Sequence, residues 1–202
     1  MSTPSNHQEL SDRLQLIESM ICEGRRKTGR YGWNFLLWGL AYYVAIGWSS
    51  LNHSSLAWPV TMVTAAILSI GIGMRFSGQD PATTTGRFLG ALWSSGGIAL
   101  FVFAFGMAYS GHASAQTLIP GVEVLLGLVN LASGLVLRWR LQQLCGVLWT
   151  IAAAISFFVS EQSASWLFLA AIFFCNIVFG IVITLSEMRS SRSVSASGSA
   201  HA

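Results

Sequence analysis

Residues 88–109 read FLGALWSSGGIALFVFAFGMAY and contain no Asp, Glu, Lys or Arg. A helix of about 20 apolar residues, rising about 1.5 Å per residue, is long enough to cross the roughly 30 Å hydrocarbon core of a bilayer. Apolar stretches of similar length lie at residues 32–50, 57–74, 118–137, 141–159 and 165–185. The sequence therefore predicts an all-α protein, a polytopic membrane bundle of six spans.

The composition of the whole chain agrees with a membrane environment. Of 202 residues, 53% are hydrophobic and 9% are charged, and the mean hydropathy is +0.59. So few polar residues cannot cover the surface of a soluble globular domain. The net charge of +3 comes from basic residues that flank apolar stretches. A nucleic-acid partner needs a basic face in polar surroundings, so none is predicted.

The Lys and Arg residues all fall on one side of the predicted bundle. They lie before the first span, in the second and fourth connections and after the last span, whereas the connections at 51–56, 110–117 and 160–164 contain none. Cytoplasmic connections are enriched in Lys and Arg, so both termini are predicted to be cytoplasmic. The expected organisation is a cytoplasmic arm (1–30), a membrane domain (31–187) and a disordered tail (188–202). The short loops favour a bacterial inner membrane.

The three short outer connections predict three antiparallel helical hairpins, which carry recurring marks. A Leu-Trp pair recurs at Leu37-Trp38, Leu92-Trp93 and Leu148-Trp149. Each returning span has a polar residue four positions before a glycine: Ser69 with Gly73, Asn130 with Gly134, and Asn176 with Gly180. A small residue lets another backbone approach, and Ser or Asn can form a hydrogen bond across the contact. The pattern favours tandem hairpin copies that pack through these faces.

Glu123 is the only acid inside a predicted span. An intramembrane carboxylate is costly and usually faces the bundle interior or water, where it can bind a proton or a cation. Asn130 lies seven residues further on and on nearly the same helix face, and Asn176 lies in the last span. Two interpretations stay open. The asparagines either hold helices together, with Glu123 near the outer interface, or line a polar pathway with Glu123.

The sequence carries no catalytic, metal or cofactor signature. It has no nucleophile elbow, phosphate-binding glycine loop, metalloprotease helix or paired-acid motif. Its three cysteines have neither paired nor metal-ligand spacing. We therefore predict a protein without enzymatic activity, bound cofactor or metal.

The N-terminal arm has apolar residues at helical spacing. They are Leu10, Leu14, Ile17 and Ile21. This spacing predicts an amphipathic helix over residues 5–23 that ends at Gly24. A basic run follows, formed by Arg25, Arg26, Lys27 and Arg30. We expect the helix to lie in the membrane interface, with the basic run on anionic headgroups. Pairing with a second copy, or docking on a cytoplasmic protein through residues 5–23, are the alternatives.

Two resemblances agree with this architecture. Residues 17–42, with Glu23-Gly24-Arg25-Arg26 and Gly32-Trp33-Asn34-Phe35-Leu36-Leu37-Trp38-Gly39, resemble a group of small, uncharacterised bacterial six-span membrane proteins. The stretch Ala132-Ser133-Gly134 to Leu137-Arg138-Trp139 adds to this likeness. The three-hairpin pattern is also similar to that of the HdeD-like acid-resistance membrane proteins, in architecture only. We expect a structural, stress-related or signalling-partner role, with a small transporter or channel as the alternative.

Overall fold

The structure is a computed structural model of the chain, and it describes residues 4–30, 32–52, 56–77, 84–111 and 114–186. These ranges contain helices and no strand. The helices are α1 (Pro4–Arg30), α2 (Gly32–Asn52), α3 (Ala57–Ser77), α4 (Thr84–Tyr109), α5 (Ala115–Val136), α6 (Arg140–Ser156) and α7 (Glu161–Ile172). A π-helical turn, η1 (Phe173–Val178), extends α7, and the chain stays helical to Ser186. The predicted tail at 188–202 lies outside the described residues.

Four of these helices are long and apolar enough to cross a membrane. They are Ala57–Arg75, Thr84–Tyr109, Ala115–Val136 and Glu161–Ser186. α2 has sufficient length, but its Trp, Tyr, Asn and Ser residues lower its mean hydropathy. α6 has only 17 residues and begins with Arg140 and two glutamines. The chain is thus an all-helical protein with the apolar helices of a membrane protein.

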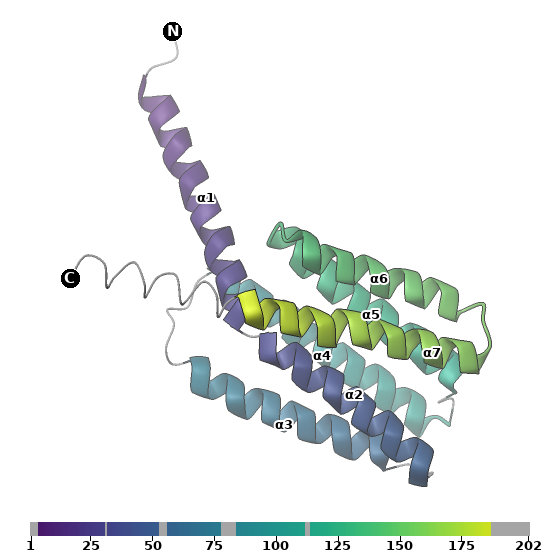
Figure 1. Cartoon of the computed structure of the whole chain (residues 1–202). Coiled ribbons are helices and arrows are strands. Elements are labelled where there is room, and N and C mark those ends of the chain that lie inside the picture. Colours follow the sequence, from purple (N-terminus) through teal and green to yellow (C-terminus); the bar gives the residue numbers. More distant parts are fainter. Residues whose placement is uncertain (1–3, 31, 53–55, 78–83, 112–113, 187–202) are drawn as a thin grey trace.

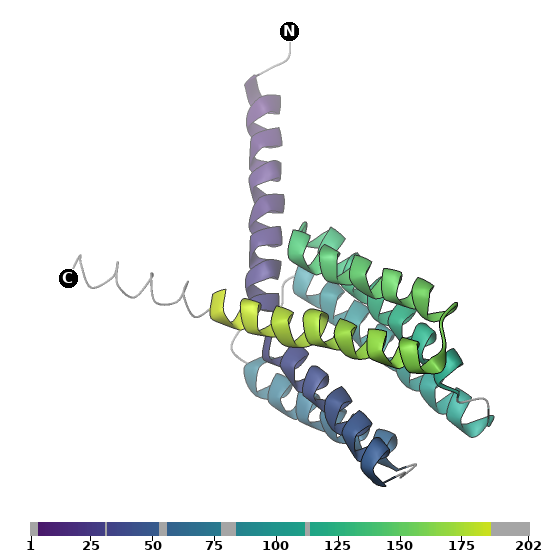
Figure 2. The same ribbon diagram turned by 45° about the vertical axis from the view of Figure 1, so that its right-hand side comes forward.

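The helices α2 to α7 run side by side in a bundle, whereas α1 runs crosswise to them from one end of that bundle (Figure 1, Figure 2). The most extensive contact joins α5 and α6, followed by the contact of α2 with α3. α7 packs against both α5 and α6, and η1 packs against α2. The closest helix pair, α5 and α6, therefore belongs to two different predicted hairpins.

The hydrophobic core lies between α5, α6 and α7 and extends to α2. Trp149 of α6 is fully buried, and its ring lies 5.8 Å from that of Phe168 on α7. Tyr42 of α2 also contacts the Phe168 ring edge-on, with the ring centroids 5.6 Å apart. Such edge contacts are favoured between aromatic rings. This core holds the α5–α6 pair against the rest of the bundle.

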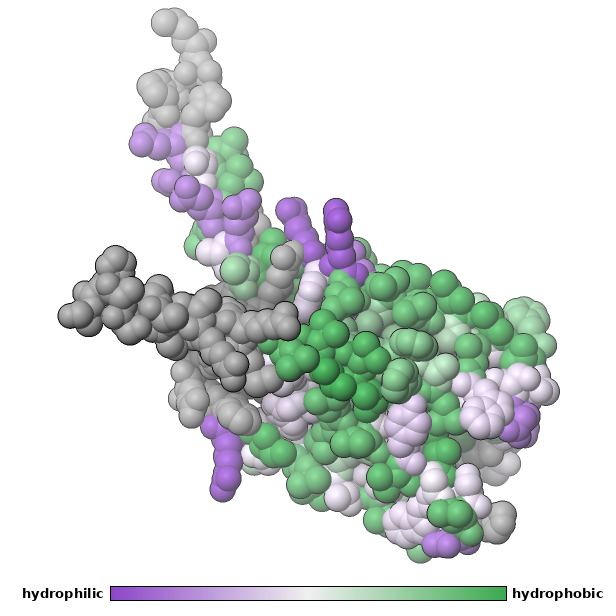
Figure 3. Space-filling model, viewed as in Figure 1, coloured by the Kyte–Doolittle hydropathy of each residue, from purple (hydrophilic) through white to green (hydrophobic). Residues whose placement is uncertain are grey.

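α3 and α4 contribute few residues to the core. Leu89 is the one buried residue described in α4, and large side chains such as Ile67, Ile98 and Val102 are more than three-fifths exposed. Hydrophobic residues cover the visible face of the bundle (Figure 3), while hydrophilic residues gather on α1 and at the ends of the bundle. An apolar surface of this extent suits lipid better than water.

α1 is longer than the sequence predicts. The helix does not end at Gly24 but continues to Arg30, and a single residue separates it from the start of α2. A glycine inside a helix costs only about 1 kcal/mol relative to alanine, and the Arg and Lys residues that follow are good helix formers. Gly24 therefore does not stop the helix, and the predicted boundary there is wrong.

Candidate functional site

Glu123 and Asn130, which the sequence singles out, lie on one face of α5 and are buried. Glu123 is 0% exposed and Asn130 is 2% exposed. α5 begins at Ala115 and contains Pro120, so Glu123 lies two turns inside the helix, about 12 Å along its axis. At this depth the carboxyl group is enclosed by protein.

Three further polar side chains lie buried on α6 at intervals of seven residues: Gln142, Trp149 and Ser156. Seven residues are two helical turns, so these three share one face of α6. From the sequence, Trp149 was singled out only as part of the recurring Leu-Trp pair, and Gln142 and Ser156 were not singled out. Their common spacing with Glu123 and Asn130 is the signal that could have identified them.

Three glycine contacts set the register of the antiparallel α5–α6 pair. A Cβ added at Gly127 would lie 2.7 Å from the Thr150 hydroxyl oxygen, and one at Gly134 would lie 2.6 Å from the backbone nitrogen of Gln143. Gly146 meets the backbone of Leu131 in the same way. Residues 127, 131 and 134 of α5 thus lie opposite residues 150, 146 and 143 of α6.

This register defines levels along the pair. Glu123 lies within two residues, about 3 Å along the axis, of the level of Ser156, and Asn130 lies within the same interval of the level of Trp149. The Ser156 hydroxyl lies beside the Glu123 carboxyl group, but the two do not have hydrogen-bond geometry. We call these five residues, Glu123, Asn130, Gln142, Trp149 and Ser156, the polar row.

Most polar atoms of the polar row have no hydrogen-bond partner among the described residues. The Asn130 amide nitrogen donates to the Leu126 carbonyl at 2.9 Å. Seven atoms stay unpaired: both Glu123 carboxyl oxygens, Asn130 Oδ1, Gln142 Oε1 and Nε2, Trp149 Nε1 and Ser156 Oγ. Each such atom costs about 1–3 kcal/mol, against a net domain stability of about 5–15 kcal/mol. The polar row is therefore where this bundle most needs further polar partners.

Asn176 lies apart from Glu123 and Asn130. It is buried in η1, and its Cβ would be 3.0 Å from a Cβ added at Gly39 of α2. π-helical turns inside α-helices are frequent at functional sites. The structure therefore brings Glu123 and Asn130 onto one face and places Asn176 against a different helix.

The predicted packing residues differ in their surroundings. Ser69 donates a hydrogen bond of 2.7 Å to Asn34 Oδ1, which joins α3 to α2. A Cβ added at Gly180 would lie 2.8 Å from Leu36 Cγ, so this glycine meets α2 as Gly134 meets α6. At Gly73 no atom of the described neighbours lies within 4 Å of an added Cβ. The close approach expected at Gly73 is absent from the described part of the chain.

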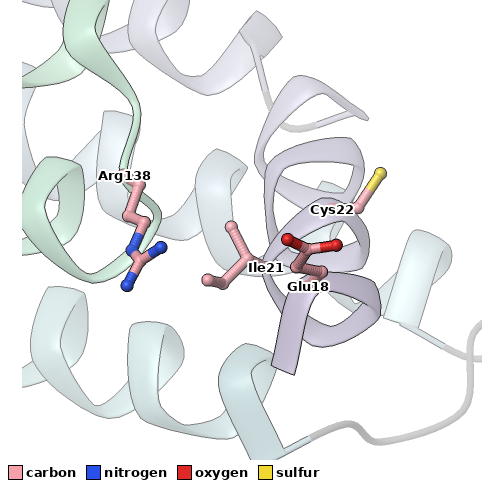
Figure 4. A pocket seen from close by; sticks show the side chains of 4 residues that line it. All are labelled: Glu18, Ile21, Cys22 and Arg138. Atoms are coloured by element: carbon pink, nitrogen blue, oxygen red, sulfur yellow. The ribbon is translucent and has the colours of Figure 1, made fainter. Parts of the chain in front are cut away.

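A shallow pocket lies where α1 meets the turn between α5 and α6. Glu18, Ile21 and Cys22 line it from α1, and Arg138 lines it from the turn (Figure 4). Arg138 has a φ of +48°, which is a left-handed backbone conformation, and it lies in the turn where the chain reverses between α5 and α6. The pocket combines one acidic and one basic side chain, so it does not select an anion or a cation by charge.

Two further predictions concern the basic run of α1 and the absence of a metal site. Arg25, Arg26, Lys27 and Arg30 form the last turns of α1, and their side chains lie outside the described set. Among the described residues, no three His, Cys, Asp or Glu side chains gather as metal ligands would. Comparisons of the chain with protein families, curated proteins and solved structures find no match.

Proposed function

We propose that the protein spans the inner membrane six times, with both termini cytoplasmic, and serves a non-enzymatic structural, stress-related or signalling role. α2 and α6 lie beside the four apolar helices, and 17 residues, the length of α6, is near the lower limit for a span. The one-sided distribution of Lys and Arg supports the orientation. The arrangement as three hairpins, and the similarity to small bacterial six-span proteins, remain part of this proposal.

The position of α1 carries this proposal. α1 runs crosswise to the bundle helices, which is parallel to the surface of a membrane that they cross (Figure 1, Figure 2). Leu10 and Leu14 are more than half exposed. The hydrophobic side of α1 is turned toward the side on which the bundle extends (Figure 3), and its hydrophilic side is turned away. This is the orientation of an amphipathic helix that rests on a bilayer.

The chemistry of α1 favours the lipid surface over other partners. Its last turns hold the basic run and lead into α2 after one residue, so this part of the helix lies at the end of α2 where the headgroups of a membrane crossed by α2 would be. Each basic residue near an anionic surface contributes about 1 kcal/mol. On a flank of the helix, Arg13 and Glu9 form an exposed ion pair of 2.6 Å. The polar side of α1, around Asp12, is where we place contact with a cytoplasmic protein partner.

A depth measurement tests the position of α1. Cys22 is the exposed cysteine, whereas Cys145 and Cys175 are buried, so a Cys22→Ser background leaves no exposed thiol. Leu14→Cys and the matched control Asp12→Cys, which lies on the opposite side of α1, are labelled with an environment-sensitive fluorophore in vesicles containing anionic lipid. We expect brominated lipid to quench the label at position 14 and not at position 12. Equal quenching at both positions, or none at either, contradicts the proposal.

The polar row favours transport as a second candidate function. A carboxyl group and several amide and hydroxyl groups buried along one helix pair are the groups that line ion and proton pathways. Proteoliposomes loaded with a pH-sensitive dye test this candidate. Proton flux that is lost in Glu123→Gln and kept in Glu161→Gln, an exposed acid at the start of α7, would replace our first proposal. Wild-type vesicles without proton or monovalent-cation flux would exclude the transport candidate.

A further inference from the structure

The polar row contains donors and acceptors that complement one another. Trp149 Nε1 can only donate, and Asn130 Oδ1, at nearly the same level, can only accept. The Ser156 hydroxyl can do both, and it lies beside the Glu123 carboxyl group. Gln142 offers an unpaired donor and an unpaired acceptor near the cytoplasmic end of α6. Every level therefore holds groups that a single small donor-acceptor molecule can join.

Water is the molecule that fits these requirements. Buried waters make about three hydrogen bonds each, typically to buried polar groups that are otherwise unpaired. Successive polar levels lie seven residues apart, which is about 10 Å along a helix. The glycine contacts hold the two backbones together between the levels, so the polar groups stay in one narrow line. Apolar ligands would leave these polar groups unpaired.

A metal cation fits the polar row less well than a proton does. Glu123 and Ser156 together supply three side-chain oxygens, whereas Ca²⁺ takes six to eight oxygen ligands. No charged side chain among the described residues acts on the Glu123 carboxyl group. A neutral carboxylic acid carries one O–H donor and leaves an acceptor, so it needs no counter-ion and can bond to Ser156 or water.

We propose that the α5–α6 pair encloses a hydrated proton-binding site, in which water pairs the polar groups within each level of the polar row and Glu123 carries an exchangeable proton. The levels extend from Glu123 to Gln142, beside the turn between α5 and α6. It does not depend on the role of α1 or on net transport. A site that binds a proton without passing it across the membrane satisfies this proposal equally well.

Infrared spectroscopy of the full-length protein in vesicles tests the site directly. A protonated carboxyl group has a carbonyl band separate from the bands of ionised carboxylates and amides. We expect one such band at neutral pH, a shift of this band to lower frequency in D₂O, and its loss in Glu123→Gln. Glu161→Gln is the matched control, since Glu161 is exposed, and it should leave the band unchanged.

Four results would overturn the proposal. The absence of the band in the wild type means that Glu123 is ionised, and a band that does not move in D₂O means that the seam is dry. A band that persists in Glu123→Gln belongs to another group. If Glu123→Gln does not fold, Ser156→Ala provides the test: the band should remain but change frequency, because the hydroxyl beside the carboxyl group is lost. A band that is identical in Ser156→Ala and wild type contradicts the site.

Discussion

Gly146 is the residue on which the closest helix contact depends. A Cβ at this position would lie 2.5 Å from the backbone nitrogen and 2.6 Å from the Cα of Leu131. These are backbone atoms, which cannot rotate away, so Gly146→Ala must push α5 and α6 apart. We expect a loss of about 1–3 kcal/mol in the free energy of unfolding, as for other overpacked sites. Denaturant unfolding in detergent micelles measures this loss.

The matched control for Gly146→Ala is Gly97→Ala on α4, where no atom of the described residues lies within 4 Å of an added Cβ. This substitution should leave the stability unchanged or raise it by up to about 1 kcal/mol, because alanine is the better helix former. A similar loss in both variants would mean that the close approach at Gly146 contributes nothing. Gly146→Ala should also displace the polar groups of α5 relative to those of α6, whereas Gly97→Ala should not.

At the residue scale, the sequence identifies the polar groups more readily than the packing groups. Glu123 stands out because charge is rare in apolar segments, and Asn130 follows it at helical spacing. Gly146 does not stand out among 20 glycines, because a glycine is informative only when the opposite backbone is known. Gly73 shows the converse: it has the same spacing pattern as Gly134 but no close neighbour among the described residues. A spacing pattern shows that a helix face is suitable for packing, not that another helix occupies it.

The contact between α2 and α3 includes one hydrogen bond between side chains, from Ser69 to Asn34. Interhelical hydrogen bonds in membranes contribute about 0.6 kcal/mol on average and at most about 1.7 kcal/mol. A double-mutant cycle of Ser69→Ala and Asn34→Ala should give a coupling energy in this range. The control is Ser95→Ala, since Ser95 bonds to the Leu92 carbonyl of its own helix, and we expect no coupling with Asn34→Ala. A coupling near zero for Ser69 and Asn34 would show that the bond does not hold the helices together.

At the scale of elements, hydropathy predicts where the helices are, because each apolar segment holds one. It does not predict which helices form the closest pair. Short loops predicted pairs joined on the outer side, yet the most extensive contact is that of α5 with α6, joined at Arg138 and Trp139. Apolar helices in lipid have no hydrophobic drive toward one partner, so small residues such as Gly127 and Gly146 select the pair. The predicted end of α1 at Gly24 is wrong for a related reason: a single glycine does not end a helix when the residues after it are good helix formers.

At the scale of the whole molecule, the number of membrane crossings decides where every connection lies. A membrane-impermeant maleimide applied to intact cells tests it, with single cysteines at Leu56, Ser110 and Ser160 in a Cys22→Ser background. These exposed positions flank the outer ends of the helices, so six spans with cytoplasmic termini predict that all three are labelled. The native Cys22, in the otherwise unchanged chain, should react only after the membrane is permeabilised.

The same labelling experiment separates six spans from four. If α2 and α6 lay on the membrane surface, with only the four longest apolar helices crossing it, positions 56 and 110 would fall on one side and position 160 on the other. No orientation of a four-span chain can then label all three cysteines from outside. Four spans would also divide the basic residues: if the N-terminus remained cytoplasmic, Arg75, Arg87, Arg138 and Arg140 would all lie outside, opposite the basic run that precedes α2. Labelling of only one or two positions would therefore overturn the six-span topology and, with it, the placement of α1 on the cytoplasmic surface.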